Sequence, residues 1–293
     1  MANCLSRQDQ VFALKLLVEG NSLRSIVRLT GIHRTTVINL MLRVGDKCRE
    51  FLDRTQRNIE ASRIECDEIW TFVQKKQGHL TAEEKFDESI GDQYLYIAQD
   101  ANTKLIITFA LGKRNGEVTN AFIDDLSERI VLPNSPNVPW GDKPQISTDG
   151  WASYPGAIQD AFGSLASYGQ LIKNYNNAEQ PGRYGPPTMS GTDRIGVVGI
   201  EDVRTICTSH VERNNLTIRT FMKRFTRLSL GFSKKRENLA AAVALHVAYF
   251  NFCWRPRQKD GPLAGRLRNT PAMEANIATT LWAMDDLYDS VMR

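Results

Sequence analysis

Hydrophobic residues at helical spacing dominate the first sixty positions of the chain. The first apolar face ends at Gly20 and consists of Val11, Leu14, Leu17 and Val18. Asn21 or Ser22 can cap a short second helix, and a third helix is predicted from about Arg34. Gly31 lies between these two helices, where a helix-turn-helix motif needs a left-handed turn residue. We therefore predict an all-α helix-turn-helix domain over residues 1–60, with a plain three-helix bundle as the alternative.

Polar side chains occupy the outward positions at the start of the predicted third helix. They are His33, Arg34, Thr35, Thr36, Asn39 and Arg43. In a helix-turn-helix domain, side chains at such positions contact base edges in the major groove of DNA. These six residues are therefore our candidates for reading double-stranded DNA.

The hydrophobic period changes to two from residue 63 onward. Ile64, Cys66, Trp70 and Phe72 alternate with Glu65, Asp67 and Thr71, as in a half-buried strand. The pattern then predicts strands at Gln93–Gln99 and Leu105–Leu111, joined as a hairpin. A helix at about Glu117–Arg129, a strand at Gln145–Thr148, a helix near 152–162 and a strand near 168–174 follow.

This order of elements is typical of ribonuclease-H-like domains, in which the first and fourth strands lie side by side. We therefore predict a mixed α/β catalytic domain over residues 61–255, with a central mixed five-stranded sheet. Residues 175–200 are rich in Asn, Gly and Pro, which predicts an inserted flexible loop. Glu237–Trp254 is strongly apolar and predicts a core helix, and residues 256–293 form a C-terminal helical extension that restarts at Thr270-Pro271.

Three carboxylates stand at positions suited to a metal site. Asp67 lies inside the first strand, Asp149 follows the fourth, and Glu212 lies in the first turn of a predicted basic helix. Cleavage of a phosphodiester builds negative charge on the entering and the leaving oxygen, and two divalent ions can neutralise both. Mg²⁺ prefers carboxylate oxygens, so these residues are candidate catalytic and metal-binding residues for two Mg²⁺ ions, with Mn²⁺ as a possible substitute.

Each acid also has a simpler interpretation. Asp67 can be a solvated strand residue, and Asp149 followed by Gly150 can be an ordinary turn. Glu212 ends the sequence Ser209-His210-Val211-Glu212, which matches a capping box. A capping box would start the same helix, so it does not exclude metal binding.

A basic segment begins beside Glu212 and contains eight cations before the next acid, Glu237. They are Arg213, Arg219, Lys223, Arg224, Arg227, Lys234, Lys235 and Arg236. Arg219 lies two helical turns beyond Glu212, on the same face, where it could contact a phosphate. We predict that this segment binds the DNA backbone, although a solvated basic face is the alternative.

Composition restricts the class of protein. The net charge is only +4, so the basic character is local and not general. The five cysteines are isolated, which argues against a zinc cluster or a disulfide framework. No apolar run approaches a membrane span, and the N-terminal residues lack a hydrophobic signal core, so we expect a cytoplasmic protein without a membrane partner.

Three segments together resemble bacterial insertion-sequence transposases of the DDE superfamily, and are most similar to the insertion-sequence-one type. The segments are CDEIWTFV around Asp67, STDGWASY around Asp149 and HVERNNLTIRTFMKRFTRLSLGFSK around Glu212. The resemblance runs from about residue 63 to Trp254, and TPAMEA at 270–275 is also typical of these enzymes. The N-terminal zinc-binding cysteines frequent in that branch have no counterpart in this chain.

The resemblance implies that Asp67, Asp149 and Glu212 form the metal-binding triad, accompanied by Arg219. It implies cleavage of DNA at element ends and transfer of the 3′-OH to target DNA. It also implies a homo-oligomer that pairs two ends and a location at the bacterial nucleoid. The alternatives are a non-catalytic DNA-binding regulator with a helix-turn-helix and a ribonuclease-H-like nuclease without strand transfer.

Overall fold

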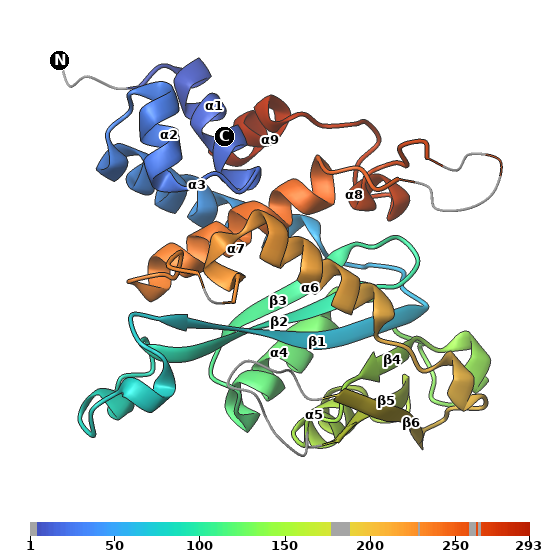
Figure 1. The fold of residues 1–293 in the computed structure, drawn as a ribbon. Helices are drawn as coiled ribbons and strands as arrows, with labels where there is room; N and C mark the ends of the chain where they lie inside the picture. Colours follow the sequence, from blue (N-terminus) through green and yellow to red (C-terminus); the bar gives the residue numbers. More distant parts are fainter. Residues whose placement is uncertain (1–4, 177–187, 228, 258–261, 263–264) are drawn as a thin grey trace.

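One twisted sheet crosses the middle of the molecule, with helices on both of its faces (Figure 1). The fold is that of a computed structural model, which describes residues 5–176, 188–227, 229–257, 262 and 265–293. Helices α6 (Ser209–Phe221) and α7 (Arg236–Phe252) cover one face. Helices α4 (Gly116–Arg129) and α5 (Tyr154–Phe162) cover the other.

The sheet is mixed and has the strand order β3-β2-β1-β4-β5-β6. Its strands are β1 (Arg63–Val73), β2 (Gly91–Asp100), β3 (Ile106–Gly112), β4 (Gln145–Thr148), β5 (Ser167–Asn176) and β6 (Thr188–Val198). The first three strands are antiparallel, and β4 runs parallel to β1 and to β5. The predicted neighbourhood of the first and fourth strands is therefore confirmed.

The predicted number of strands is wrong by one. The region 175–200 was expected to be a flexible loop, but β6 pairs antiparallel with β5 and extends the sheet to six strands. Ile195 and Val197 are 44% and 43% exposed, so this edge strand buries little of its apolar surface. Its pairing depends on backbone hydrogen bonds to β5, which a pattern of buried hydrophobic side chains cannot reveal.

The N-terminal helices occur where the hydrophobic pattern placed them. They are α1 (Arg7–Val18), α2 (Leu23–Thr30) and α3 (Arg34–Thr55). Gly31 ends α2 with φ of 72°, the left-handed conformation that a helix-turn-helix requires at this point. Ile26 of α2 and Val37 of α3 are fully buried, as expected for the two packed helices.

Helix α3 continues beyond this motif and packs on α7. The two backbones approach so closely that a Cβ atom on Gly45 would lie 2.4 Å from the carbonyl oxygen of Ala241. Phe51 at the end of α3 contacts Phe252 of α7 with ring centroids 5.0 Å apart. The buried residues of the N-terminal helices and of the sheet region thus belong to one continuous hydrophobic core.

The predicted core helix after the basic segment is confirmed as α7. The predicted basic helix with Glu212 in its first turn is confirmed as α6, which ends at Phe221. A short 3-10 turn, η5 (Lys223–Phe225), follows it, so the cations from Lys223 onward lie outside this helix. Thr270 caps α8 (Pro271–Glu274) through a hydrogen bond from the backbone N–H of Met273, as its sequence predicted. The last helix is α9 (Met284–Met292), and the remaining 3-10 turns are η1 (Gln77–His79), η2 (Glu84–Phe86), η3 (Trp140–Asp142) and η4 (Val203–Thr205).

Candidate active site

Two acids on one face of β1 hold α6 in place. Glu65 Oε2 accepts hydrogen bonds from the backbone N–H groups of His210 and Val211, at 2.7 and 3.0 Å. Asp67 Oδ2 accepts one from the side-chain amide of Asn215, at 2.7 Å. Residues two apart on a strand face the same side, so one strand fixes both the start and the second turn of α6.

The alternative interpretation of Glu212, a capping box from Ser209 to Glu212, is wrong. Helix α6 begins after Thr208, whose side chain makes no capping bond to the helix backbone. Glu65 satisfies the first amides of the helix from across the sheet instead, a contact that local sequence could not reveal. The Glu212 carboxylate does not cap the helix and has partners outside the helix backbone.

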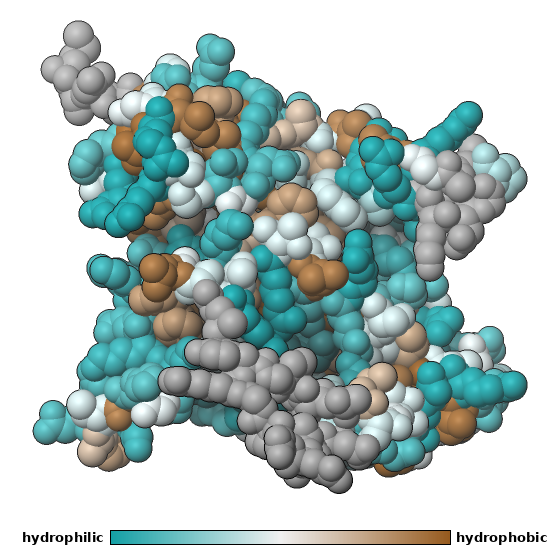
Figure 2. Space-filling view, in the orientation of Figure 1, coloured by the Kyte–Doolittle hydropathy of each residue, from teal (hydrophilic) through white to brown (hydrophobic). Residues whose placement is uncertain are grey.

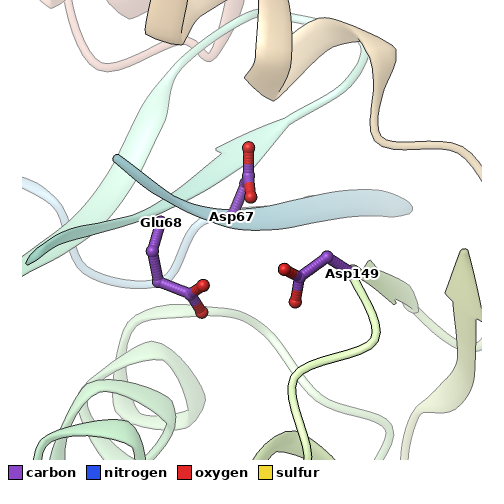
Figure 3. Close-up of side chains that lie close together, drawn as sticks. All are labelled: Asp67, Glu68 and Asp149. Atoms are coloured by element: carbon purple, nitrogen blue, oxygen red, sulfur yellow. The ribbon is translucent and has the colours of Figure 1, made fainter. Parts of the chain in front are cut away.

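Three carboxylates converge where β1 and β4 lie side by side. Asp67, Glu68 and Asp149 each present an oxygen that lies within 4.8 Å of the other two (Figure 3). Cys66 of β1 is in register with Thr148 of β4, so Asp67 and Asp149 follow at neighbouring positions. We call these three residues the acid cluster. Asp67 and Asp149 were predicted to meet; Glu68, from the opposite face of β1, was not predicted.

The electrostatics of the acid cluster favour a bound cation. Burial, together with the charges of Asp149 and Glu212, raises the pKa of Asp67 to about 7. Burial and the Asp149 charge likewise raise the pKa of Glu68 to about 7. Carboxylates that repel one another in a half-buried site gain from a divalent ion, and an all-oxygen donor set suits Mg²⁺ or Mn²⁺. These residues thus fit such an ion.

Arg114 forms ion pairs with two acids of this cluster. Its Nη2 atom lies 3.1 Å from Glu68 Oε2 and 3.1 Å from Asp149 Oδ2. The guanidinium also lies over the Trp151 ring, 4.4 Å from its centroid. Arg114 stands in the short connection between β3 and α4, and its sequence context carried no signal for this role.

Glu212 lies outside the acid cluster. Its carboxylate pairs with Lys173 Nζ of β5 at 2.7 Å and accepts a hydrogen bond from the Thr208 hydroxyl. The predicted triad is thus brought together only in part: Asp67 meets Asp149, while Glu212 is bound to a lysine. Glu212, Asn215 and Arg219 are spaced three and four residues apart, so α6 turns one polar face toward β1.

The predicted DNA-reading residues of α3 lie at the surface. His33, Arg34, Thr35, Thr36, Asn39 and Arg43 are all exposed. The His33 ring also caps α3 by accepting a hydrogen bond from the backbone N–H of Thr35 at 3.3 Å. Arg43 donates to the side chain of Gln10. The face is therefore polar and open, although one of its arginines is already hydrogen-bonded.

The cations of the basic segment divide by exposure. Those that are exposed are Arg213, Lys223, Arg227, Lys234, Lys235 and Arg236. Arg236 nevertheless donates to the backbone oxygen of Leu111 at 2.6 Å. Arg224 is half-buried and donates to the Ser233 hydroxyl at 2.7 Å, and burial lowers its pKa to about 10. Arg224 therefore supports the fold of this segment and is not presented to solvent as the exposed cations are.

Comparisons with known proteins provide little further information. No protein-family model matches the chain, and no curated protein matches its sequence. Among solved structures, the piggyBac transposase in a synaptic complex with hairpin DNA is similar at 10% identity and a TM-score of 0.42, covering 98% of this chain and 70% of that one. The Mos1 strand transfer complex is similar at 11% identity and a TM-score of 0.24, covering 84% and 76%. Likenesses at these scores assign neither a fold family nor a function. Among the described residues, none of the helices has the length and apolar character of a membrane span.

Proposed function

We propose that this protein is a divalent-metal-dependent DNA transposase with a ribonuclease-H-like catalytic domain. The observation that carries the proposal is the acid cluster, because three carboxylates within 4.8 Å of one another, at the meeting of two strands, form an all-oxygen donor set that a divalent cation can bind. The similarity of the segments around Asp67, Asp149 and Glu212 to insertion-sequence transposases supports the same reading.

Asp67 and Asp149 would hold the metal, and Glu212 would join them from α6. A bound divalent ion would activate a water and neutralise charge on the phosphate under attack. Asn215 orients Asp67 through its 2.7 Å hydrogen bond, and Glu65 fixes the start of the helix that carries Glu212. For Glu212 to act as a ligand, its ion pair with Lys173 must open, and Lys173 would then be available to a DNA phosphate.

DNA would be held at two further places. The exposed polar face of α3, from His33 to Arg43, would read base pairs of the element ends in the major groove. Arg213, Arg219 and the exposed cations after α6 would contact backbone phosphates. Transposition joins two ends, so we propose that the active form is a homo-oligomer.

A second candidate function is a non-catalytic DNA-binding regulator. One observation favours it: Arg114 pairs with Glu68 and Asp149, and Lys173 pairs with Glu212, so three of the four acids have a cationic partner without a metal. Asp67 accepts a hydrogen bond from the Asn215 amide. In such a protein the acids would serve only to join β1, β4, β5 and α6. The two candidates differ in whether DNA is cut.

Nicking of a DNA fragment that spans one element boundary tests the proposal. The wild-type protein should nick it with Mg²⁺ or Mn²⁺, and Asp149→Asn should lose at least about 100-fold in rate while DNA binding is kept. Asp160→Asn is the matched control, because Asp160 is an exposed acid on α5 outside the cluster. Equal nicking by Asp149→Asn and Asp160→Asn would refute the assignment of Asp149. DNA binding by the wild type without nicking in either metal would favour the regulator.

A further inference from the structure

A pocket of about 300 Å³ lies beside the far half of β1. Its lining combines aromatic rings with cations, chiefly Trp70, Phe72, Phe232, Lys76 and Arg227. None of its lining residues in the described part of the chain is acidic. We call it the aromatic pocket; the function proposed above makes no use of it.

The sheet leaves room for this pocket. Strand β4 ends opposite Cys66, so among the described residues no strand pairs with that side of β1 from Asp67 onward. On the other edge of β1, β2 pairs as far as Val73. The segment between α6 and α7 takes the vacant side: Thr71 donates to the backbone oxygen of Arg224, and Gln74 N–H donates to that of Ser233. Figure 2 shows hydrophobic surface over this segment, toward the left edge of the view.

The aromatic rings of the pocket form a connected array. Phe72 stacks on Phe232 with centroids 4.8 Å apart, and Trp70 lies 5.7 Å from Phe72 at a tilt of 36°. Lys76 Nζ lies 5.8 Å from the centroid of the Trp70 ring. Both Trp70 and Phe72 are half-exposed, so faces of the array remain open to a ligand. Aromatic rings flanked by cations are the features that bind unpaired nucleotides, through stacking on the base and charge on the phosphate.

The pocket adjoins the acid cluster. Trp70 follows Glu68 by two residues on the same face of β1, and lies about 10 Å along the strand from Asp67. Arg219 of α6 lies between the two sites. It follows Asn215, which binds Asp67, by one helical turn, and its backbone oxygen accepts a hydrogen bond from the hydroxyl of Thr226, a residue of the pocket lining, at 2.8 Å. A nucleic acid chain can therefore pass from the acid cluster to the pocket along a row of cations.

We propose that the aromatic pocket binds an unpaired nucleotide next to the phosphate held at the acid cluster, by stacking the base on Trp70 and Phe72. This inference rests on the proposed function for the position of the phosphate. A paired base in duplex DNA has both faces covered by its neighbours, so only a frayed, flipped or single-stranded nucleotide can occupy the pocket.

Binding of tailed and blunt DNA, measured without metal, tests the inference. The probes are a blunt duplex, the same duplex with a three-nucleotide thymidine tail, and one with an abasic tail. The wild-type protein should prefer the thymidine tail over the other two on the order of tenfold, which equals about 1.4 kcal/mol. Trp70→Ala should abolish the preference and leave blunt-duplex affinity unchanged, and Trp70→Phe should keep most of it.

Phe86→Ala is the matched control, because Phe86 is 90% exposed and lies outside the pocket. Thermal unfolding of each variant checks that the fold is kept. A tail preference retained in Trp70→Ala, or equal binding of thymidine and abasic tails, would overturn the inference. The binding assay contains no metal, so its result is independent of the nicking assay described above. A tail preference in the binding assay, together with no nicking in the presence of Mg²⁺ or Mn²⁺, would refute the proposed function and leave the inference about the pocket standing. Nicking without a tail preference would overturn the inference about the pocket and leave the proposed function standing.

Discussion

Replacement of Glu65 by alanine should loosen the helix that carries Glu212. Glu65 is only 2% exposed, and its carboxylate accepts the backbone N–H groups of His210 and Val211 at 2.7 and 3.0 Å. Thr208, the residue before the helix, makes no side-chain capping bond. The alanine variant would therefore leave two amides of the first turn without their acceptor beneath the helix.

The expected cost follows from these two bonds. A hydrogen bond within a protein contributes about 1–1.5 kcal/mol net, so the loss of two should lower the free energy of unfolding by about 2–3 kcal/mol. For a chain of this size, each kcal/mol corresponds to about 2–4 °C in Tm, so Tm should fall by about 4–12 °C. Burial raises the pKa of Glu65, which means that charging its carboxyl group is itself costly. The lower half of these ranges is therefore expected.

Urea unfolding followed by circular dichroism measures this cost. Glu65→Gln keeps a carbonyl oxygen as acceptor and should stay within about 1 kcal/mol of the wild type. Glu60→Ala is the matched control, because Glu60 is an exposed glutamate just before β1. If Glu65→Ala and Glu60→Ala differ by less than about 0.5 kcal/mol, Glu65 does not stabilise α6 in the way described.

Two further predictions concern other parts of the fold. Arg34→Ala should weaken binding of element-end DNA by about 1–3 kcal/mol and random DNA by less, in a gel-shift titration; an equal loss on both would assign Arg34 to phosphate contact. His246 of α7 is buried, and burial lowers its pKa to about 4. In the unfolded chain the His246 imidazole takes up a proton below about pH 6.5, whereas in the folded protein it does so only below about pH 4. The free energy of unfolding should therefore fall by about 3 kcal/mol as the pH drops from about 6.5 to about 4. His246→Leu should remove this dependence in urea titrations at pH 4.5 and 7; a slope that persists would place its origin in another group.

The sequence by itself determined the elements that bury a regular apolar face. The spacing of Val37, Leu40 and Val44 predicted α3, and Gly31 predicted the turn before it. The alternation from Ile64 to Phe72 predicted the strand β1 but not its buried face throughout: Trp70 and Phe72 are half-exposed, whereas Ile69, Thr71 and Val73 are buried. These features depend on a few residues near in sequence, so a periodic pattern is enough to find them. The edge strand β6 was missed because its side chains are largely exposed and its backbone bonds carry no sequence signature.

The acidic site was predictable only in part. A strand that carries Asp67 beside one that ends at Asp149 follows from the expected strand order. The contacts of Glu68, Glu65 and Glu212 do not, because each depends on how distant elements pack. Glu68 pairs with Arg114 from the connection between β3 and α4, Glu65 accepts hydrogen bonds from two amides in the first turn of α6, and Glu212 pairs with Lys173 of β5. Short-range periodicity indicates which face of an element is buried. The partner of a buried charge depends instead on how elements distant in sequence pack against one another, so only the tertiary structure could identify these partners.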